Sequence, residues 1–168
     1  MKELKVISVF TLLIIIIFAA SLKRNDILLK TGCISFISMK SIKNDGFVIR
    51  ANVNISPRTK IRFTDSEWNG NHFGFDENDI TWITGDKIIQ NGSRISFTNL
   101  NSKASVSEGT IIGSMRLSKK NDAIFAYLGG KRMPTIFLAA VANNELGYGT
   151  LINTGLINRE TAIIFQKE

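Results

Sequence analysis

The 168-residue sequence has one cysteine, one histidine and two prolines. The single cysteine, Cys33, excludes an intrachain disulfide and a cysteine-rich zinc site. With one histidine, any catalytic triad or cysteine–histidine pair would have to use His72. So few prolines, together with only 13 glycines, exclude collagen-like and proline-rich low-complexity architectures. Hydrophobic residues make up 44% of the chain, which is typical of a folded domain rather than of a disordered chain.

The N-terminal segment differs from the rest of the chain in hydropathy. Lysines near the N-terminus precede an uncharged, largely apolar run over residues 6–20, and small residues follow it. The run is shorter than the roughly 20 apolar residues that span a bilayer, and it suits a signal peptide. We therefore predict a signal peptide over residues 1–21, a single domain over residues 22–168, and an extracytoplasmic location (secreted, periplasmic or at the cell surface). The alternative is an uncleaved membrane anchor over residues 6–22, which would be the only contact with a membrane.

Positive charge exceeds negative charge, with 21 Lys and Arg against 14 Asp and Glu. Lys60, Arg62 and Arg94 are expected on the outward faces of strands, where a basic stripe could attract nucleic acid, acidic glycans or anionic lipid. No nucleic-acid motif with interleaved aromatic residues accompanies the charge, so we expect no nucleic-acid partner. Lysines on edge strands also oppose aggregation. We interpret the charge as a determinant of solubility, with weak attraction to acidic surfaces.

Alternation of apolar and polar residues is the main structural signal after Leu22. Residues 47–54 alternate in the way that is typical of a half-buried strand. Asn91-Gly92 predicts a two-residue hairpin between residues 87–90 and 93–98. No segment of about 12 residues keeps a helical period. Further strands are predicted over residues 33–38, 60–64, 80–83, 123–128, 135–141 and 162–165.

Eight or so short strands separated by turns predict an all-β fold, an antiparallel sandwich. Cys33 lies in an apolar stretch and is expected to pack as a small hydrophobic residue. The core is expected to include Phe47, Ile49, Ile61, Phe63, Ile95, Phe97, Phe125 and Ile164.

Four segments resemble a group of bacterial secreted β-sandwich modules. Residues 63–70 (FTDSEWNG) are similar to an F-T-D-x-x-W-x-G segment, and residues 45–47 (DGF) to the entry of a second strand. Residues 117–127 (LSKKNDAIFAY) resemble L-S-x-x-x-D-x-(apolar)-x-A-Y, and residues 134–140 (PTIFLAA) resemble P-T-F-(apolar)-A-A with one extra residue. These modules are parts of large extracellular proteins and look distantly like the lamin-tail domain. The resemblance, over roughly residues 31–165, implies an immunoglobulin-like β-sandwich and an exterior address, and it implies no activity.

The densest polar stretch, residues 64–79 (TDSEWNGNHFGFDEND), lies between two predicted strands. Its carboxylate and amide oxygens are the ligands that calcium prefers, and extracellular calcium sites tend to be weak. One alternative is a solvated connection in which Asp65 and Asn69 cap turns. The other is a catalytic site with paired carboxylates. The candidate calcium ligands are Asp65, Glu67, Asp76 and Asp79, and calcium is the only cofactor that the sequence suggests.

The same stretch contains His72 and three aromatic residues, and Trp82 follows it. A lone histidine without a second histidine or a cysteine nearby is a poor metal signature, so we expect a surface histidine. Exposed aromatic side chains here would indicate contact with a glycan or a protein, whereas buried ones would form the edge of the core. The aromatic residues concerned are Trp68, Phe73, Phe75 and Trp82.

Two classes of function remain. The first is a non-catalytic exported module for binding or adhesion, whose partner is a protein or a glycan at the cell surface or in the periplasm. The second is a metal-assisted hydrolase that uses the acidic loop from Asp65 to Asp79. The sequence contains no nucleophile elbow, zinc signature or phosphate loop, which favours the first class and predicts no catalytic residue. The two classes differ in whether Asp65, Glu67, His72, Asp76 and Asp79 converge in a concave site.

Overall fold

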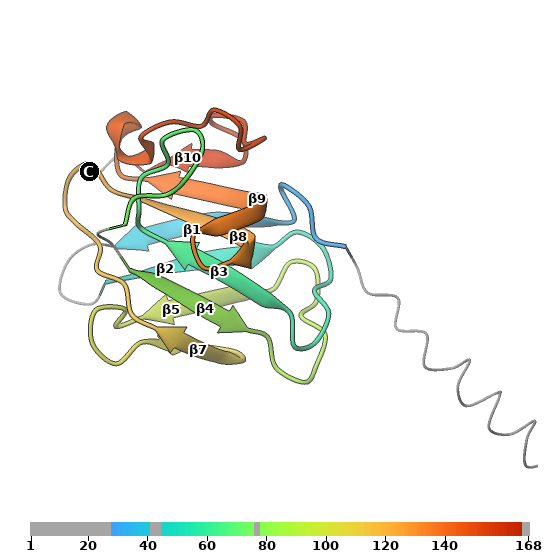
Figure 1. Ribbon diagram of the computed structural model, residues 1–168. Coiled ribbons are helices and arrows are strands. Elements are labelled where there is room, and N and C mark those ends of the chain that lie inside the picture. The colour runs from blue at the N-terminus through green and yellow to red at the C-terminus, as the bar shows by residue number, and fades with distance from the viewer. Residues whose placement is uncertain (1–27, 41–44, 76–77, 166–168) are drawn as a thin grey trace, which may run out of the picture.

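The computed structural model describes residues 28–40, 45–75 and 78–165 (Figure 1). These residues form an all-β fold, as predicted. In the described ranges no helix is long and apolar enough to cross a membrane, and the predicted signal peptide or anchor lies outside them. The elements are β1 (Ile34–Lys40), β2 (Gly46–Ala51), β3 (Lys60–Thr64), β4 (Asp79–Ile83), β5 (Arg94–Thr98), β6 (Ser105–Val106), β7 (Thr110–Gly113), β8 (Ala123–Gly130), β9 (Met133–Ala142), the 3-10 helix η1 (Glu145–Tyr148) and β10 (Ala162–Ile164).

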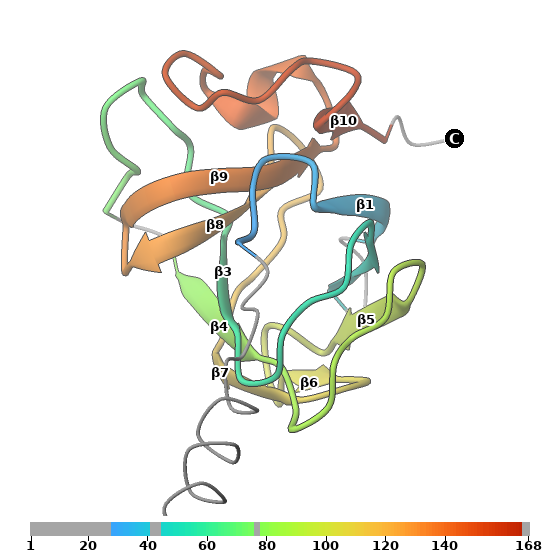
Figure 2. The same ribbon diagram turned by 90° about the vertical axis from the view of Figure 1, so that its right-hand side faces the viewer.

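The strands form two sheets that face each other (Figure 2). One sheet has the order β1-β2-β5-β6 and the other the order β10-β9-β8-β3-β4-β7. Every strand pair is antiparallel except β9 and β10, which are parallel. The prediction of a wholly antiparallel fold is therefore wrong at this edge. A parallel neighbour requires a crossover, and residues 143–161 supply it by running back over the sheet before β10 begins.

The predicted hairpin around Asn91-Gly92 is correct in its turn and wrong in its first strand. Ser93 N–H donates to Gln90 O at 3.1 Å, so the turn forms. Residues 87–90 are not a strand; within them Ile89 makes an isolated bridge with Ile55. Gly92 N–H also donates to Ala51 O at 2.7 Å. The turn is thus fastened to the end of β2, and β5 pairs with β2 and β6 instead of with the segment before the turn.

The main core lies between the two sheets. Phe47 of β2 and Phe97 of β5 stack with their ring centroids 4.4 Å apart, and Phe63 of β3 in the other sheet lies 4.9 Å from Phe47. These ring contacts join the sheets, because offset and tilted aromatic pairs add to the free energy gained by burial. Cys33 is buried in the same core, as predicted, and burial raises the pKa of its thiol to about 11.

The six-stranded sheet also buries its opposite, outer face. Along β8, Ile124 and Ala126 point into the main core, whereas Phe125 and Tyr127 point to the outer face and are also buried. Phe125 therefore belongs to a second hydrophobic cluster, which we call the outer cluster, and half-buried Ile164 packs against it. The other six predicted core residues are buried in the main core.

Candidate functional site

The β3–β4 connection, which contains the acidic stretch, folds over the outer cluster. Its two buried aromatic side chains are Trp68 and Phe73, whose ring centroids lie 5.0 Å apart. The Trp68 indole N–H donates to Ile152 O at 2.8 Å. Gly149 has a φ of +70°, and a Cβ there would lie 2.6 Å from Trp68 O, so this close approach of two backbones requires glycine. The connection is consequently a packed layer, and these two aromatic residues form the edge of a core.

Asp79, at the start of β4, is a charged anchor for the β8–β9 hairpin. Its side chain is 6% exposed and lies 2.9 Å from Arg62 Nη1 and 3.1 Å from Lys131 Nζ. Arg62 Nε also donates to Gly129 O at 3.2 Å. One carboxylate thus pairs with two cations, and it ties β3 and β4 to the tip of the hairpin.

Asp65, just after β3, is 5% exposed and faces the end of the main core. Its Oδ2 accepts a hydrogen bond from Arg116 N–H at 3.2 Å, and its Oδ1 has no hydrogen-bond partner among the described residues. Burial raises the pKa of Asp65 to about 7, and the nearby charge of Asp122 adds to the shift.

Two of the predicted calcium ligands remain, Glu67 and Asp76. Glu67 is exposed on the surface of the connection, and Asp76 lies outside the described residues. Among the residues that are described, no group of three or more His, Cys, Asp and Glu side chains is placed to hold a metal ion. Because part of the acidic loop lies outside the described residues, the calcium hypothesis and the hydrolase alternative stay predictions.

Three aspartates from the segments that carry the family resemblance meet at one end of the molecule. Asp65, Asp45 and Asp122 accept hydrogen bonds from the successive backbone N–H groups of Arg116, Leu117 and Ser118. We call residues 115–118 the closing strap, because buried Met115 and Leu117 cover the end of the main core. The sequence showed each aspartate beside a predicted strand end, but it did not show that one segment would contact all three.

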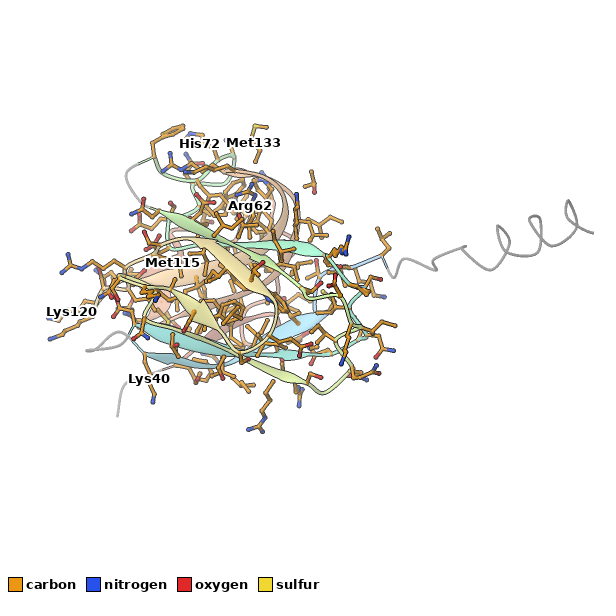
Figure 3. The ribbon with its side chains drawn as sticks, turned by 90° about the horizontal axis from the view of Figure 1, so that it is seen from below. Lys40, Arg62, His72, Met115, Lys120 and Met133 are labelled. Carbon is orange, nitrogen blue, oxygen red and sulfur yellow. The ribbon has the colours of Figure 1, made fainter. Side chains whose placement is uncertain are left out.

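A second feature that the sequence left open is the state of Phe75. Of the described Phe, Trp and Tyr residues, Phe75 alone is exposed, at 73%. The guanidinium of Arg132 lies 5.7 Å from the centroid of its ring, and the imidazole of His72 lies 5.5 Å from it. Met133 is 69% exposed, and Figure 3 shows it beside His72 at one extremity of the molecule. These four residues form the tip surface.

Local hydrogen bonds hold both halves of the tip surface in place. Asn69 Oδ1 accepts from Asn71 N–H and His72 N–H, each at 2.9 Å, so Asn69 caps this turn as predicted. In the β8–β9 hairpin, Arg132 N–H donates to Tyr127 Oη at 3.1 Å. His72 itself is exposed, as predicted. Because the backbone at His72 and Arg132 is already held, these two residues would lose little backbone conformational entropy when a partner binds.

Three depressions in the surface of the described residues lie away from the tip surface. Two of them, of about 340 and 360 Å³, adjoin η1 and β10 and share Glu145 and Ile164 in their linings. A third, of about 470 Å³, lies between Arg58 and Thr110. None of these three is lined by a described residue of the acidic stretch.

The chain matches no protein-family model, no curated protein and no solved structure.

Proposed function

We propose that the protein is a non-catalytic binding or adhesion module that contacts a protein or a glycan at the cell surface through its tip surface. The module is an immunoglobulin-like, lamin-tail-like β-sandwich, exported by a signal peptide over residues 1–21 or held by an anchor over residues 6–22. The observation that carries this proposal is the exposure of Phe75 beside Arg132 and His72.

The composition of the tip surface supports a role in binding. Aromatic residues, methionine and arginine are enriched at protein interfaces, and the tip surface contains Phe75, Met133 and Arg132. An exposed phenylalanine forfeits the free energy that burial would supply, and the other described aromatic side chains are buried or partly buried, so we attribute the exposure of Phe75 to a cause outside the fold. A partner that covers the ring supplies that cause, and the adjacent guanidinium provides a charged group for orientation.

The architecture supports the finer description of the fold. Two sheets that face each other across one aromatic core are the arrangement expected of a β-sandwich. The segments that resemble secreted modules supply the residues at which the strap meets the sheets, namely Asp45, Asp65 and Asp122. A shared architecture would explain why these positions form the resemblance.

The test compares Phe75→Ser with Ile112→Ser, using the purified full-length chain. Ile112 on β7 is 62% exposed and lies outside the tip surface, so its replacement controls for the loss of exposed apolar area. We expect the wild type and Ile112→Ser to bind isolated cell envelopes equally in a sedimentation assay. Phe75→Ser should bind about tenfold more weakly, as expected for an interface anchor. Equal binding by Phe75→Ser would refute the proposal, provided that circular dichroism shows an intact fold.

A further inference from the structure

Three connections contribute described residues to the end of the molecule that the strap closes. Asp45 precedes β2, residues 99–104 join β5 to β6, and residues 114–122 join β7 to β8. Leu100 N–H donates to Asp45 O at 3.1 Å, and Met115 N–H donates to Leu100 O at 2.9 Å. The three connections therefore lie side by side.

Exposed positive charge gathers on these connections and on the adjoining end of β1. Figure 3 shows Lys40 and Lys120 at this end, with Met115 between them and the core. We call five exposed cations here the basic end: Lys40, Lys103, Arg116, Lys119 and Lys120. None of the five forms an ion pair with another described residue.

The acidic residues of the same connections do not offset this charge at the surface. Asp45 and Asp122 are both buried, and their carboxylates accept hydrogen bonds from the strap. In the six-stranded sheet, by contrast, cations are paired with a carboxylate, since Arg62 and Lys131 share the carboxylate of Asp79. Buried carboxylates thus hold the backbone of residues 116–118, while the cations beside it point to solvent.

The uncharged residues around the basic end indicate which class of anionic partner it would bind. The exposed side chains between the cations include Asn101, Ser102, Ser118 and Asn121, which donate and accept hydrogen bonds. None of the large exposed hydrophobic residues in the described chain lies in residues 99–104 or 114–122, so these two connections offer no apolar side chain to a bilayer. No described aromatic residue lies in them either, so nothing there would stack on bases.

We propose that the basic end binds an acidic polysaccharide by charge and by hydrogen bonds to hydroxyl groups. The basic end is separate from the tip surface, and binding there does not depend on the tip surface. The inference therefore goes beyond the proposed function. Binding to a polyanion releases condensed counterions, so the affinity must fall steeply with salt concentration, in proportion to the number of contacts.

The test measures binding of the full-length chain to alginate and to heparin by calorimetry over a series of salt concentrations. The test variant is Lys119→Gln/Lys120→Gln, and the control is Lys60→Gln/Lys87→Gln, which removes the same charge from exposed sites elsewhere. At low salt we expect the test variant to bind about tenfold more weakly, with a log–log salt slope smaller by about two, and the control to match the wild type.

Three outcomes would overturn the proposal. The first is an equal loss in test and control variants, because binding would then reflect net charge alone. The second is an affinity that does not change with salt. The third is tighter binding to phosphatidylglycerol vesicles or to duplex DNA than to either polysaccharide, with the same loss in the test variant. Phe75→Ser should leave polysaccharide binding unchanged, so failure of the proposed function would be distinguished from failure here.

Discussion

The two faces of the six-stranded sheet are covered in different ways. A second sheet covers the inner face, and the contacts between the sheets come from alternate residues of regular strands. The outer face is covered by the β3–β4 connection and by residues 143–161, which contain only one turn of 3-10 helix. The outer cover is fixed by one isolated parallel bridge, between Trp68 and Gly149, and by side-chain hydrogen bonds between distant segments. Examples are Trp68 Nε1–H to Ile152 O and Asn153 Nδ2–H to Gly70 O at 3.0 Å. Such irregular covers open more readily than sheets.

The largest effect is expected in the main core. Phe63→Ala removes a ring with no exposed surface that lies 4.9 Å from Phe47 and 5.1 Å from Phe97. We expect a loss of about 4 kcal/mol in the free energy of unfolding, because a cavity would remain between two regular sheets. Urea denaturation followed by far-UV circular dichroism measures it. A loss below about 2 kcal/mol would show that the sheets can close over the gap.

In the outer cluster, Phe73→Ala is expected to cost less, about 3 kcal/mol, because the irregular cover can relax around the cavity. The two tryptophans report the two regions separately, since Trp68 lies in the outer cluster and Trp82 lies in the main core. In a Trp82→Phe background, Trp68 fluorescence should change at a lower urea concentration than the circular dichroism does. Phe73→Ala should widen that gap. Coincident transitions in both proteins would mean that the two clusters unfold as one unit.

The difference between the clusters also explains what the sequence could predict. Alternation placed Ile61 and Phe63 correctly, because β3 presents polar residues to the other face. In β8 both faces are buried, so Phe125 is buried as predicted, but the polarity pattern does not show that Phe125 and Ile124 lie on opposite faces. β7 was missed because Ile112 is exposed and interrupts the alternation.

The functional residues depended even more on distant contacts. The acidic stretch was recognised from its composition, but the burial of Trp68 and Phe73 and the exposure of Phe75 depend on segments more than 50 residues away. The same holds for Asp79, whose partner Lys131 comes from a hairpin that the local sequence does not connect to it. Asn69 was predicted to cap a turn, and it does so because that interaction is local.

A smaller effect is expected at the end of the main core, where Asp65 contacts the strap. Its pKa is raised from 3.8 to about 7 in the folded protein, so the folded state binds this proton more tightly than the unfolded state does. Ionisation therefore opposes folding, and stability should fall as the pH rises from about 4 to about 7 and then level off. We expect a loss on the order of 2 kcal/mol between pH 5 and pH 8, since local opening of the strap limits the cost.

Thermal unfolding across this pH range measures the effect. Asp65→Asn keeps an acceptor for Arg116 N–H but cannot ionise, so its melting temperature should vary less with pH than that of the wild type. His72→Gln removes the one histidine of the chain, so it serves as the control and should keep the wild-type profile. A wild-type melting temperature that is constant or rises between pH 5 and pH 8 would contradict the burial argument.

The smallest effect is expected where the outer cover meets the tip surface. Asn69→Ala leaves Asn71 N–H and His72 N–H without their acceptor, and because both groups are near solvent we expect a loss of about 1 kcal/mol. The loss should appear in the Trp68 transition and not in the main-core transition. Asn101→Ala, at an exposed turn between β5 and β6, should change neither of the two transitions.

The same variant tests the role of the turn in binding. If Asn69→Ala also weakens binding to cell envelopes two- to threefold while Phe75 stays in place, the turn contributes by orienting the ring. Unchanged binding would mean that the turn does not orient the ring.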